Sequence, residues 1–444
     1  MKPWLVVAWL VVISSSGLSQ SLSMEYFGNV NTRSVPGFRY SACWGYTAVD
    51  GHEYALLGCD SGTAIIDMQA IPPVEVDFVY GPKNGWREMK TYLHYAYIVS
   101  ESSDTLNGAG VQIVDLRNLP DSASLIKTFI WTHTTGARIS RVHSVSVSGN
   151  YLYLNGGNFS GIRILDISNP EDPIQAGSYN GPYIHDSHVR NDTIYGSAIN
   201  SGGGLDILDA TNKANPTRIQ LLQYPGSGTH NAWTTLDGKH VLTTDEIGTT
   251  PKTLKIWNIA NLNSIQYVTE YSNTISIVHN VFIKGNLAYV AWYADGLKVV
   301  DISNPASPQL AGYYDTYPGA PEANYVGVWG ADPYFPSGKV ILSDMSTGLH
   351  VVRYTGDKRG IVKGVITDYW TGSPLPDVIL HFPNLSITRW TDVDGKYLFG
   401  YAPGSFRVKM ERAGYGTFET LITVTENETT FVNWKIVRKT AGGF

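Results

Sequence analysis

The fold is decided by a phrase that occurs twice in clear form, "GIRILDISNPEDPIQAGSY" at Gly161–Tyr179 and "GLKVVDISNPASPQLAGYY" at Gly296–Tyr314. In each copy a glycine leads into a short alternating apolar run, a proline-containing turn follows, and a second short run ends in tyrosine. Further copies of the first run begin at Thr63, Gly110, Gly204, Thr253 and Gly348. The spacing between copies is 43 to 52 residues.

Each repeat carries two more strand-like runs before this phrase. The first is opened by a histidine or tryptophan, and the second is rich in tyrosine. The opening residues are Trp44, Trp86, His143, His185, His230, His279 and Trp329. A repeat of 40–50 residues with four strands is typical of a propeller blade. The sequence therefore predicts an all-β chain: a seven-bladed β-propeller over residues 20–356, followed by a small β-sandwich. A linear β-solenoid is the alternative, although its repeats are usually shorter.

The last repeat predicts how the ring closes. Its copy, "GLHVVRYTG" at Gly348–Gly356, stops after the third strand. Near the N-terminus, "SMEYFGNV" at Ser23–Val30 resembles the missing fourth strand, "QLAGYYD". We expect Ser23–Val30 to complete the last blade, which would remove two free sheet edges.

These phrases resemble a known family. "VVDISNPASP" and "ILDISNPEDP" look like LVIVD repeats, and the longer run from His185 to Pro305 resembles the family called choice-of-anchor B. Members of that family are secreted bacterial propellers that carry different C-terminal attachment signals. The resemblance covers about Ser23–Gly356 and implies a secreted or cell-surface propeller, with no biochemical activity attached.

The N-terminus predicts export. Lys2 precedes the apolar run Trp4–Ile13, and the small residues Gly17 and Ser19 end the segment. This pattern is typical of a signal peptide over residues 1–19, and the apolar run is too short to span a bilayer. A lone N-terminal membrane anchor is the alternative. No later segment looks transmembrane, so we expect a secreted protein or one on the outer cell surface.

The residues after 356 follow a different pattern. Alternating strands with turns at Thr371-Gly372, Asp394-Gly395 and Pro403-Gly404 predict a β-sandwich over residues 357–438, with a short tail at 439–444. This stretch resembles carboxypeptidase regulatory-like domains, which implies a prealbumin-like sandwich and not a peptidase. Asp392 and Asp394 in "TDVDG" predict a tight hairpin turn, because the rest of a calcium-loop ligand set is missing.

Charge and cysteine content narrow the function classes. A formal charge of −6, with no run of Lys or Arg, gives no reason to expect that the protein binds nucleic acid.

The two cysteines, Cys43 and Cys59, would lie opposite each other in a hairpin folded about Gly51. An oxidising compartment would permit a disulfide between them, and two unpaired thiols are the alternative.

The repeated histidine is the candidate functional group. In a propeller the first strand of each blade lines the channel, and the loops before it and after the second strand open on one face. This places His143, His185, His230 and His279 near one mouth of the channel, with Asp245 and Glu246 beside them. Imidazoles with carboxylates suit a divalent or transition metal, although no cofactor is certain. The alternative is a structural latch between blades. His188 would face the opposite side of its strand from His185.

The remaining patterns favour binding over catalysis. The Asp of "VVDIS" and "ILDIS", at the end of the third strand, recurs in most repeats, so we expect it to start a turn. The sequence holds no nucleophile elbow, phosphate loop, His-Glu-x-x-His motif or dinucleotide fingerprint, and the catalytic residues are unknown. The sequence favours a monomeric binding protein for a surface protein or glycan. The alternative is a metal-dependent extracellular enzyme, a hydrolase or oxidase.

Overall fold

The computed structural model describes residues 21–36, 39–133, 136–200, 203–247, 252–272 and 275–439. The expected signal peptide, residues 1–19, lies outside these ranges, as do residues 440–444 of the tail. Across the described residues the chain forms short β-strands and no α-helix; one 3-10 turn spans Thr105–Asn107. The all-β prediction is confirmed. Within the same ranges, no helix is long and apolar enough to cross a membrane.

Most sheets repeat one pattern, in which four consecutive strands pair antiparallel in chain order. The first three sheets are β3 (Cys43–Thr47), β4 (Glu53–Cys59), β5 (Gly62–Asp67) and β6 (Val74–Tyr80); β7 (Arg87–Tyr92), β8 (Tyr95–Ser100), β9 (Val111–Asp115) and β10 (Ser124–Phe129); and β13 (Ser144–Ser148), β14 (Tyr151–Asn155), β15 (Ile162–Asp166) and β16 (Ile174–Tyr179). A small hairpin, β11 (Trp131–Thr132) with β12 (Arg138–Ile139), lies between the second and third of these sheets.

The pattern continues along the chain. The next three sheets are β17 (Asp186–Arg190), β18 (Thr193–Ala198), β19 (Gly204–Asp209) and β20 (Thr217–Leu222); β21 (Thr229–Thr234), β22 (His240–Asp245), β23 (Leu254–Asn258) and β24 (Gln266–Tyr271); and β25 (Val281–Lys284), β26 (Leu287–Ala291), β27 (Leu297–Asp301) and β28 (Gln309–Tyr314). One more sheet takes β29 (Val328–Asp332), β30 (Val340–Asp344) and β31 (Gly348–Tyr354).

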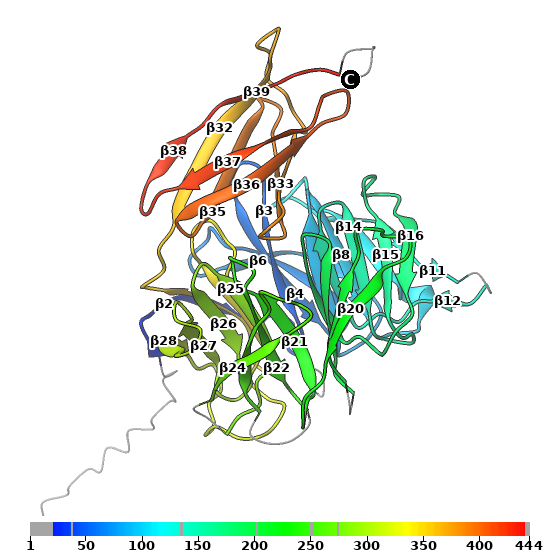
Figure 1. Cartoon of the computed structure of the whole chain (residues 1–444), viewed down its shortest axis with the longest axis vertical. Coiled ribbons are helices and arrows are strands. Elements are labelled where there is room, and N and C mark those ends of the chain that lie inside the picture. The colour runs from blue at the N-terminus through cyan, green and yellow to red at the C-terminus, as the bar shows by residue number, and fades with distance from the viewer. Residues whose placement is uncertain are drawn as a thin grey trace, which may run out of the picture.

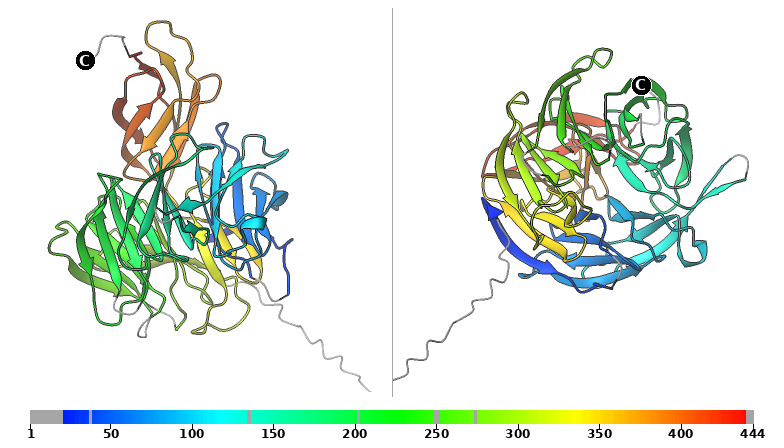
Figure 2. Two further views of the ribbon diagram at one scale, coloured as in Figure 1. Left: turned by 90° about the vertical axis from the view of Figure 1, so that its right-hand side faces the viewer. Right: turned by 90° about the horizontal axis from the view of Figure 1, so that it is seen from below.

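These sheets lie in a ring (Figure 2). The first strand of each sheet contacts the first strand of the next, from β3 through β7, β13, β17, β21 and β25 to β29, and β29 contacts β3 again. The first strands therefore line the centre of the ring. Apolar clusters fill the spaces between neighbouring sheets, as where Val99 and Val111 of one sheet meet Val145 and Leu152 of the next.

The N-terminal strands join the ring at its last sheet. β2 (Met24–Val30) pairs antiparallel with β31, with Met24 opposite Tyr354 and Val30 opposite Leu349, and so supplies the fourth strand. The two-residue strand β1 (Ser21–Leu22) pairs with β28 of the neighbouring sheet, which the sequence did not predict. The first described residues therefore contact two adjacent sheets.

The repeated acidic or amide residue shapes the turn after the third strand in six of these sheets. Its side-chain oxygen accepts the backbone N–H two residues later, at 2.7 to 3.0 Å. The residues that do so are Asp67, Asp115, Asp166, Asp209, Asn258 and Asp301. This bond satisfies an amide that the strand ladder leaves free, which confirms the predicted turn role.

The predicted disulfide between Cys43 and Cys59 is wrong, because both are free, buried thiols. Ala48 and His52 bond across the turn, so the hairpin is centred one residue before Gly51, and Cys43 pairs with Leu57 instead of Cys59. The cysteines are therefore diagonal neighbours about 7–8 Å apart, beyond the reach of a disulfide. Burial raises the pKa of both thiols to about 12, which keeps them protonated.

The residues after 356 form a separate two-sheet unit, the tail module (residues 357–438). One sheet holds β32 (Gly360–Asp368), β35 (Lys396–Tyr401), β38 (Thr429–Phe431) and β39 (Trp434–Ile436), and the other holds β33 (Ile379–Phe382), β34 (Ile387–Trp390), β36 (Gly404–Glu411) and β37 (Phe418–Val424). Phe382 of one sheet stacks on Phe399 of the other, 3.9 Å between ring centroids. Asp392 accepts the backbone N–H groups of Asp394 and Lys396, which makes "TDVDG" a tight turn.

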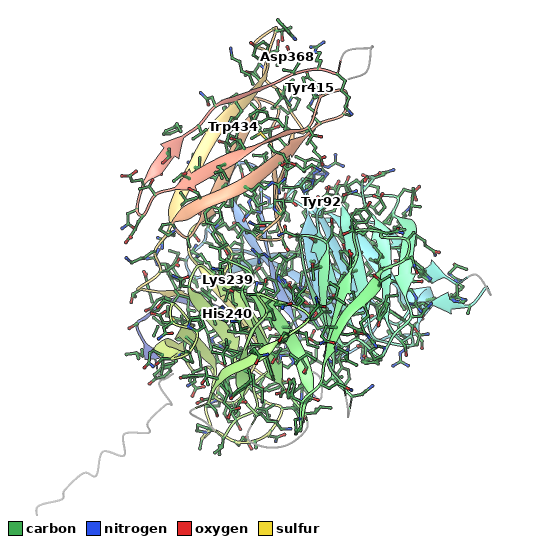
Figure 3. All side chains as sticks on the ribbon, viewed as in Figure 1. Tyr92, Lys239, His240, Asp368, Tyr415 and Trp434 are labelled. Atoms are coloured by element: carbon green, nitrogen blue, oxygen red, sulfur yellow. The ribbon has the colours of Figure 1, made fainter. Side chains whose placement is uncertain are left out.

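The tail module covers one mouth of the ring (Figure 1). The turn between β33 and β34 enters that mouth, where Leu385 is buried and the Ser386 hydroxyl donates to the carbonyl oxygen of Val189 at 2.5 Å. Lys284 and Asp357 form an ion pair of 2.9 Å whose side chains are only 2% and 3% exposed. Tyr92 lies at the same junction (Figure 3). The channel is therefore capped on this side, which we name the capped mouth.

Trp390 provides a test of this cap. The Trp390 indole stacks on the side chain of Tyr46, which lies in β3 of the ring of sheets, with 6.4 Å between the ring centroids. We expect Trp390→Ala to lower the free energy of unfolding by about 2 kcal/mol, because a half-buried aromatic contact is lost. Urea unfolding measures the change. The control is Trp370→Ala, whose side chain is 73% exposed on the tail module and should change stability by less than about 0.5 kcal/mol. Equal effects of the two substitutions would contradict the role of Trp390.

Candidate functional site: a histidine cluster at the open mouth

The structure brings four of the sequence-predicted residues together at the end of the channel opposite the tail module, the open mouth. His143, His185 and His279 come just before β13, β17 and β25, and His230 lies in β21. Their imidazole rings contact one another in chain order, with centroid distances of 3.8, 4.2 and 4.0 Å. We name these four side chains the histidine cluster.

The two outer histidines bond to neighbouring sheets. Nδ1 of His143 lies 2.7 Å from a carboxylate oxygen of Glu101, which follows β8 in the preceding sheet, and this bond lowers the pKa of Glu101. Nδ1 of His279 bonds to the carbonyl oxygen of Trp329 in the following sheet. For these two residues the geometry is that of a latch between sheets.

The two inner histidines differ from the outer pair. Nδ1 of His185 and Nδ1 of His230 are buried and make no hydrogen bond of normal geometry among the described residues. Each ring interacts more weakly with the next sheet, His185 with the backbone of His230 and His230 with the backbone of His279. A bulge at His230 explains its position, because Thr229 and Asn231 pair with consecutive residues of β22 and leave His230 between them. Buried polar nitrogens normally have a partner. The inner pair therefore lacks the well-formed bonds that hold the outer pair.

The asparagine that follows His230 joins the inner strands. The Asn231 amide donates to the Asp186 carboxylate at 2.6 Å, and its oxygen accepts the backbone N–H of Val281 at 3.0 Å. Asn231 thus ties three consecutive sheets together, which holds the backbone that carries the inner histidines.

Glu246 supplies the carboxylate of the site. Its two oxygens lie 3.7 Å from Nε2 of His230 and 3.7 Å from Nε2 of His279, and it accepts the Tyr293 hydroxyl at 2.7 Å. His185, His230 and Glu246 each offer one ligand atom, and these three atoms all lie within 4.8 Å of one another. Small side-chain adjustments would bring these three atoms onto one ion, since bonds to zinc are about 2.0–2.2 Å long.

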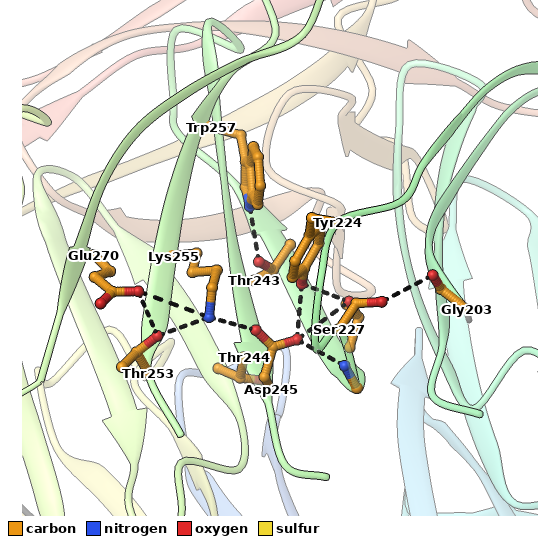
Figure 4. Close-up of polar contacts among 12 residues, drawn as sticks. Gly203, Tyr224, Ser227, Thr243, Thr244, Asp245, Thr253, Lys255, Trp257 and Glu270 are labelled. Atoms are coloured by element: carbon orange, nitrogen blue, oxygen red, sulfur yellow. Dashed lines mark hydrogen bonds and ion pairs between the residues drawn. The ribbon is translucent and has the colours of Figure 1, made fainter. Parts of the chain in front are cut away.

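Asp245, predicted as a fellow ligand, does not join this group. Its carboxylate accepts the Tyr224 hydroxyl at 2.7 Å and the backbone N–H of Gly228 at 3.1 Å, and it pairs with Lys255 at 2.7 Å (Figure 4). Consecutive strand residues face opposite sides, so the Glu246 side chain points towards the channel and the Asp245 side chain points away from it, towards residues of its own sheet. Asp245 is a structural residue.

Burial keeps three of the four imidazoles uncharged. It lowers the pKa of His230 and of His279 to about 3, and it lowers the pKa of His185 well below its usual value. At neutral pH these imidazoles are therefore neutral, with lone pairs available. Metal binding requires this form of the ring, so the environment favours a cation ligand over an anion.

A cavity of about 290 Å³ opens beside the histidine cluster. Besides the four histidines and Glu246, its lining residues are Arg39, Trp86, Tyr293, Tyr325, Trp329 and Met345. Trp86 and Trp329 occupy the repeat position that holds histidine in other sheets, so periodicity could have found them. Arg39 and Tyr325 lie in irregular loops and gave no sequence signal.

His188 lies away from this cavity, as predicted. Its Nε2 bonds to the Thr234 hydroxyl at 2.9 Å, and its ring lies against Trp233, 4.1 Å between centroids. It lines a smaller cavity of about 100 Å³ beneath the tail module. His188 therefore belongs to the packing of the inner strands.

Comparisons with known proteins support the propeller fold. A model of the LVIVD repeat matches residues 140–181 and 277–316. Similar solved structures include Kuenenia stuttgartiensis hydrazine synthase, at 12% identity and a TM-score of 0.52 over 70% of this chain and 95% of that one. They also include the Neurospora crassa Pan2 WD40 domain, at 12% identity and a TM-score of 0.52 over 75% of this chain and 96% of that one. The chain folds as a β-propeller. No curated protein matches the sequence of this chain, and the structural likenesses at this identity show the fold alone.

Proposed function

We propose that the chain is a secreted seven-bladed β-propeller, closed by its N-terminal strand and followed by a prealbumin-like β-sandwich, that acts as a binding protein. The ring of sheets and the pairing of β2 with β31 support the seven blades. The signal-like residues 1–19 and the likeness to choice-of-anchor B proteins support export to the cell surface, where a monomer would meet surface proteins or glycans.

The proposed binding function centres on the open mouth, where the site takes a divalent transition metal. The observation that carries this step is the convergence of His185, His230 and Glu246, whose ligand atoms lie within 4.8 Å of one another, with Nε2 of His230 3.7 Å from the Glu246 carboxylate. Two imidazoles and a carboxylate form a ligand set that zinc, copper and nickel accept. His143 and His279 are held by neighbouring sheets and would orient the inner pair.

Zinc titration tests this proposal. Protein stripped with EDTA should bind one equivalent of Zn²⁺, and Glu246→Gln should weaken the affinity at least about tenfold, because a neutral amide replaces the anionic ligand. His230→Ala should weaken binding further. The matched control is His52→Ala, since His52 pairs with Asp67 at 2.9 Å, outside the cluster, and should leave zinc affinity unchanged.

Each outcome has a clear meaning. Glu246→Gln keeps the shape of the side chain, so a loss of zinc binding with unchanged circular dichroism would support the metal site. Stoichiometric binding that survives in both Glu246→Gln and His230→Ala would overturn it. If the unsubstituted protein binds no zinc, copper or nickel, the cluster is a latch between blades and the metal proposal fails.

A metal-dependent extracellular enzyme is the second candidate. The observation that favours it is the cavity of about 290 Å³ directly beside the cluster, because catalytic metal sites keep a position open for substrate. A hydrolase or oxidase would show turnover that EDTA abolishes and added metal restores. Stoichiometric metal with no turnover of ester, glycoside or phenolic substrates would leave the binding function.

A further inference from the structure

The cavity beside the histidine cluster has an aromatic wall. Trp86 and Tyr325 stand at its rim with 49% and 39% of their surfaces exposed, whereas Tyr293, only 2% exposed, lies deeper. Tyr293 meets Tyr325 edge to face, 5.5 Å between centroids. Large aromatic faces left open to solvent provide stacking surfaces for the apolar face of a ring-shaped ligand.

Arg39 adds a positive charge to this wall. It is exposed and lines the cavity, and Nη1 donates to the carbonyl oxygen of Tyr325 at 2.9 Å, which holds the guanidinium against the rim. The guanidinium carries further N–H donors in a planar fork that matches a carboxylate. Glu246, the carboxylate on the lining, already accepts a bond from Tyr293. The ligand chemistry indicated is therefore an anionic group beside a ring.

We propose that the open mouth binds the terminal residue of an acidic glycan, with its carboxylate on Arg39 and its ring against Trp86 and Tyr325. This inference rests on the proposed function, because it names the ligand of the same site. The tail module caps the other end of the channel, so a ligand can enter from one side only. A chain end fits such a blind pocket, whereas a continuous chain does not.

Tryptophan fluorescence with glucuronate and trigalacturonate tests the proposal, in zinc-loaded and in metal-free protein. Arg39→Gln should weaken trigalacturonate binding about tenfold or more, since a charge-assisted pair is lost. Trp86→Ala should have a similar effect. The controls are Arg117→Gln, a 54% exposed arginine paired with Asp115, and Trp370→Ala, which should not change the affinity. None of the four substitutions should alter zinc affinity.

The outcomes separate this inference from the proposed function. Glucose and glucuronate binding equally well would overturn the role of Arg39, and benzoate binding more tightly than glucuronate would overturn the glycan. Zinc binding without any binding of glucuronate or trigalacturonate would sink this inference and leave the metal site. Glycan binding that depends on Arg39 in protein that takes up no metal would support this inference and sink the metal site.

Discussion

Lowering the pH from 7 to 4.5 is expected to remove about 3 kcal/mol of stability from the propeller through one residue, His188. Burial lowers the pKa of His188 to about 3, with the nearby Arg190 charge adding to the effect. In the unfolded chain the pKa is about 6.5. Between these two values the unfolded chain binds a proton that the folded chain does not, so the free energy of unfolding falls as pH falls from about 6.5 towards 3.

The contribution of His188 can be isolated by comparing pH slopes. Urea unfolding in EDTA at pH 7 and pH 4.5 should show that His188→Gln loses about 3 kcal/mol less than the unsubstituted protein over this interval. Thr234→Val is the matched control, because it removes the hydroxyl 2.9 Å from Nε2 but keeps the titrating ring. Thr234→Val should be less stable at both pH values with the slope unchanged. A His188→Gln variant that keeps the full slope would contradict the prediction.

The strand pattern was predictable because its signals are local. The glycine at the start of most third strands, the alternating apolar residues and the Asx turn at positions such as Asp166 and Asp301 each act within a few residues. Repetition then amplified a weak signal. The short strand β1 could not be predicted, since two residues carry no pattern and its pairing with β28 depends on the assembled ring.

The cysteines show how a small local error spreads. The sequence predicts a hairpin folded about Gly51, and the structure centres it one residue earlier, as the bond between Ala48 and His52 shows. A shift of one residue in the turn moves the strand register by two. Cys43 then pairs with Leu57, and a bond that depends on direct opposition is lost.

The histidine cluster was predictable in position but not in chemistry. All four histidines occupy one repeat position, so periodicity alone brings them to one mouth. Their partners are not periodic: Glu101 reaches His143, while Nδ1 of His185 and Nδ1 of His230 make no hydrogen bond of normal geometry among the described residues. The choice between Asp245 and Glu246 likewise depends on which side of a strand end each faces. Such differences arise from tertiary contacts that a repeat does not encode.

Closure of the ring depends on β2, whose residues are more than 300 positions from their partners in sequence. Asn29 donates from its side chain to the carbonyl oxygens of Thr347 and Leu349, at 2.8 and 2.9 Å. Val30 is buried in a core shared with Leu349 and Val351. Among the described residues, no disulfide links β2 to β31. Hydrogen bonds and apolar contacts therefore hold these two strands together.

Removing residues 21–30 is therefore expected to lower the free energy of unfolding by about 5 kcal/mol or more, because a strand of apolar contacts and ladder bonds is lost and the edge of β31 is exposed. Thermal unfolding and light scattering measure the loss and the resulting aggregation. Gly28→Val offers a single-residue version, since a Cβ at Gly28 would lie 2.6 Å from Cδ of Pro73 at a φ of +150°. A peptide spanning residues 21–30, added in trans, should restore stability to the truncated protein, whereas the same peptide with Val30→Asp should not. A truncated protein as stable as the chain that starts at residue 21 would show that β2 does not close the ring.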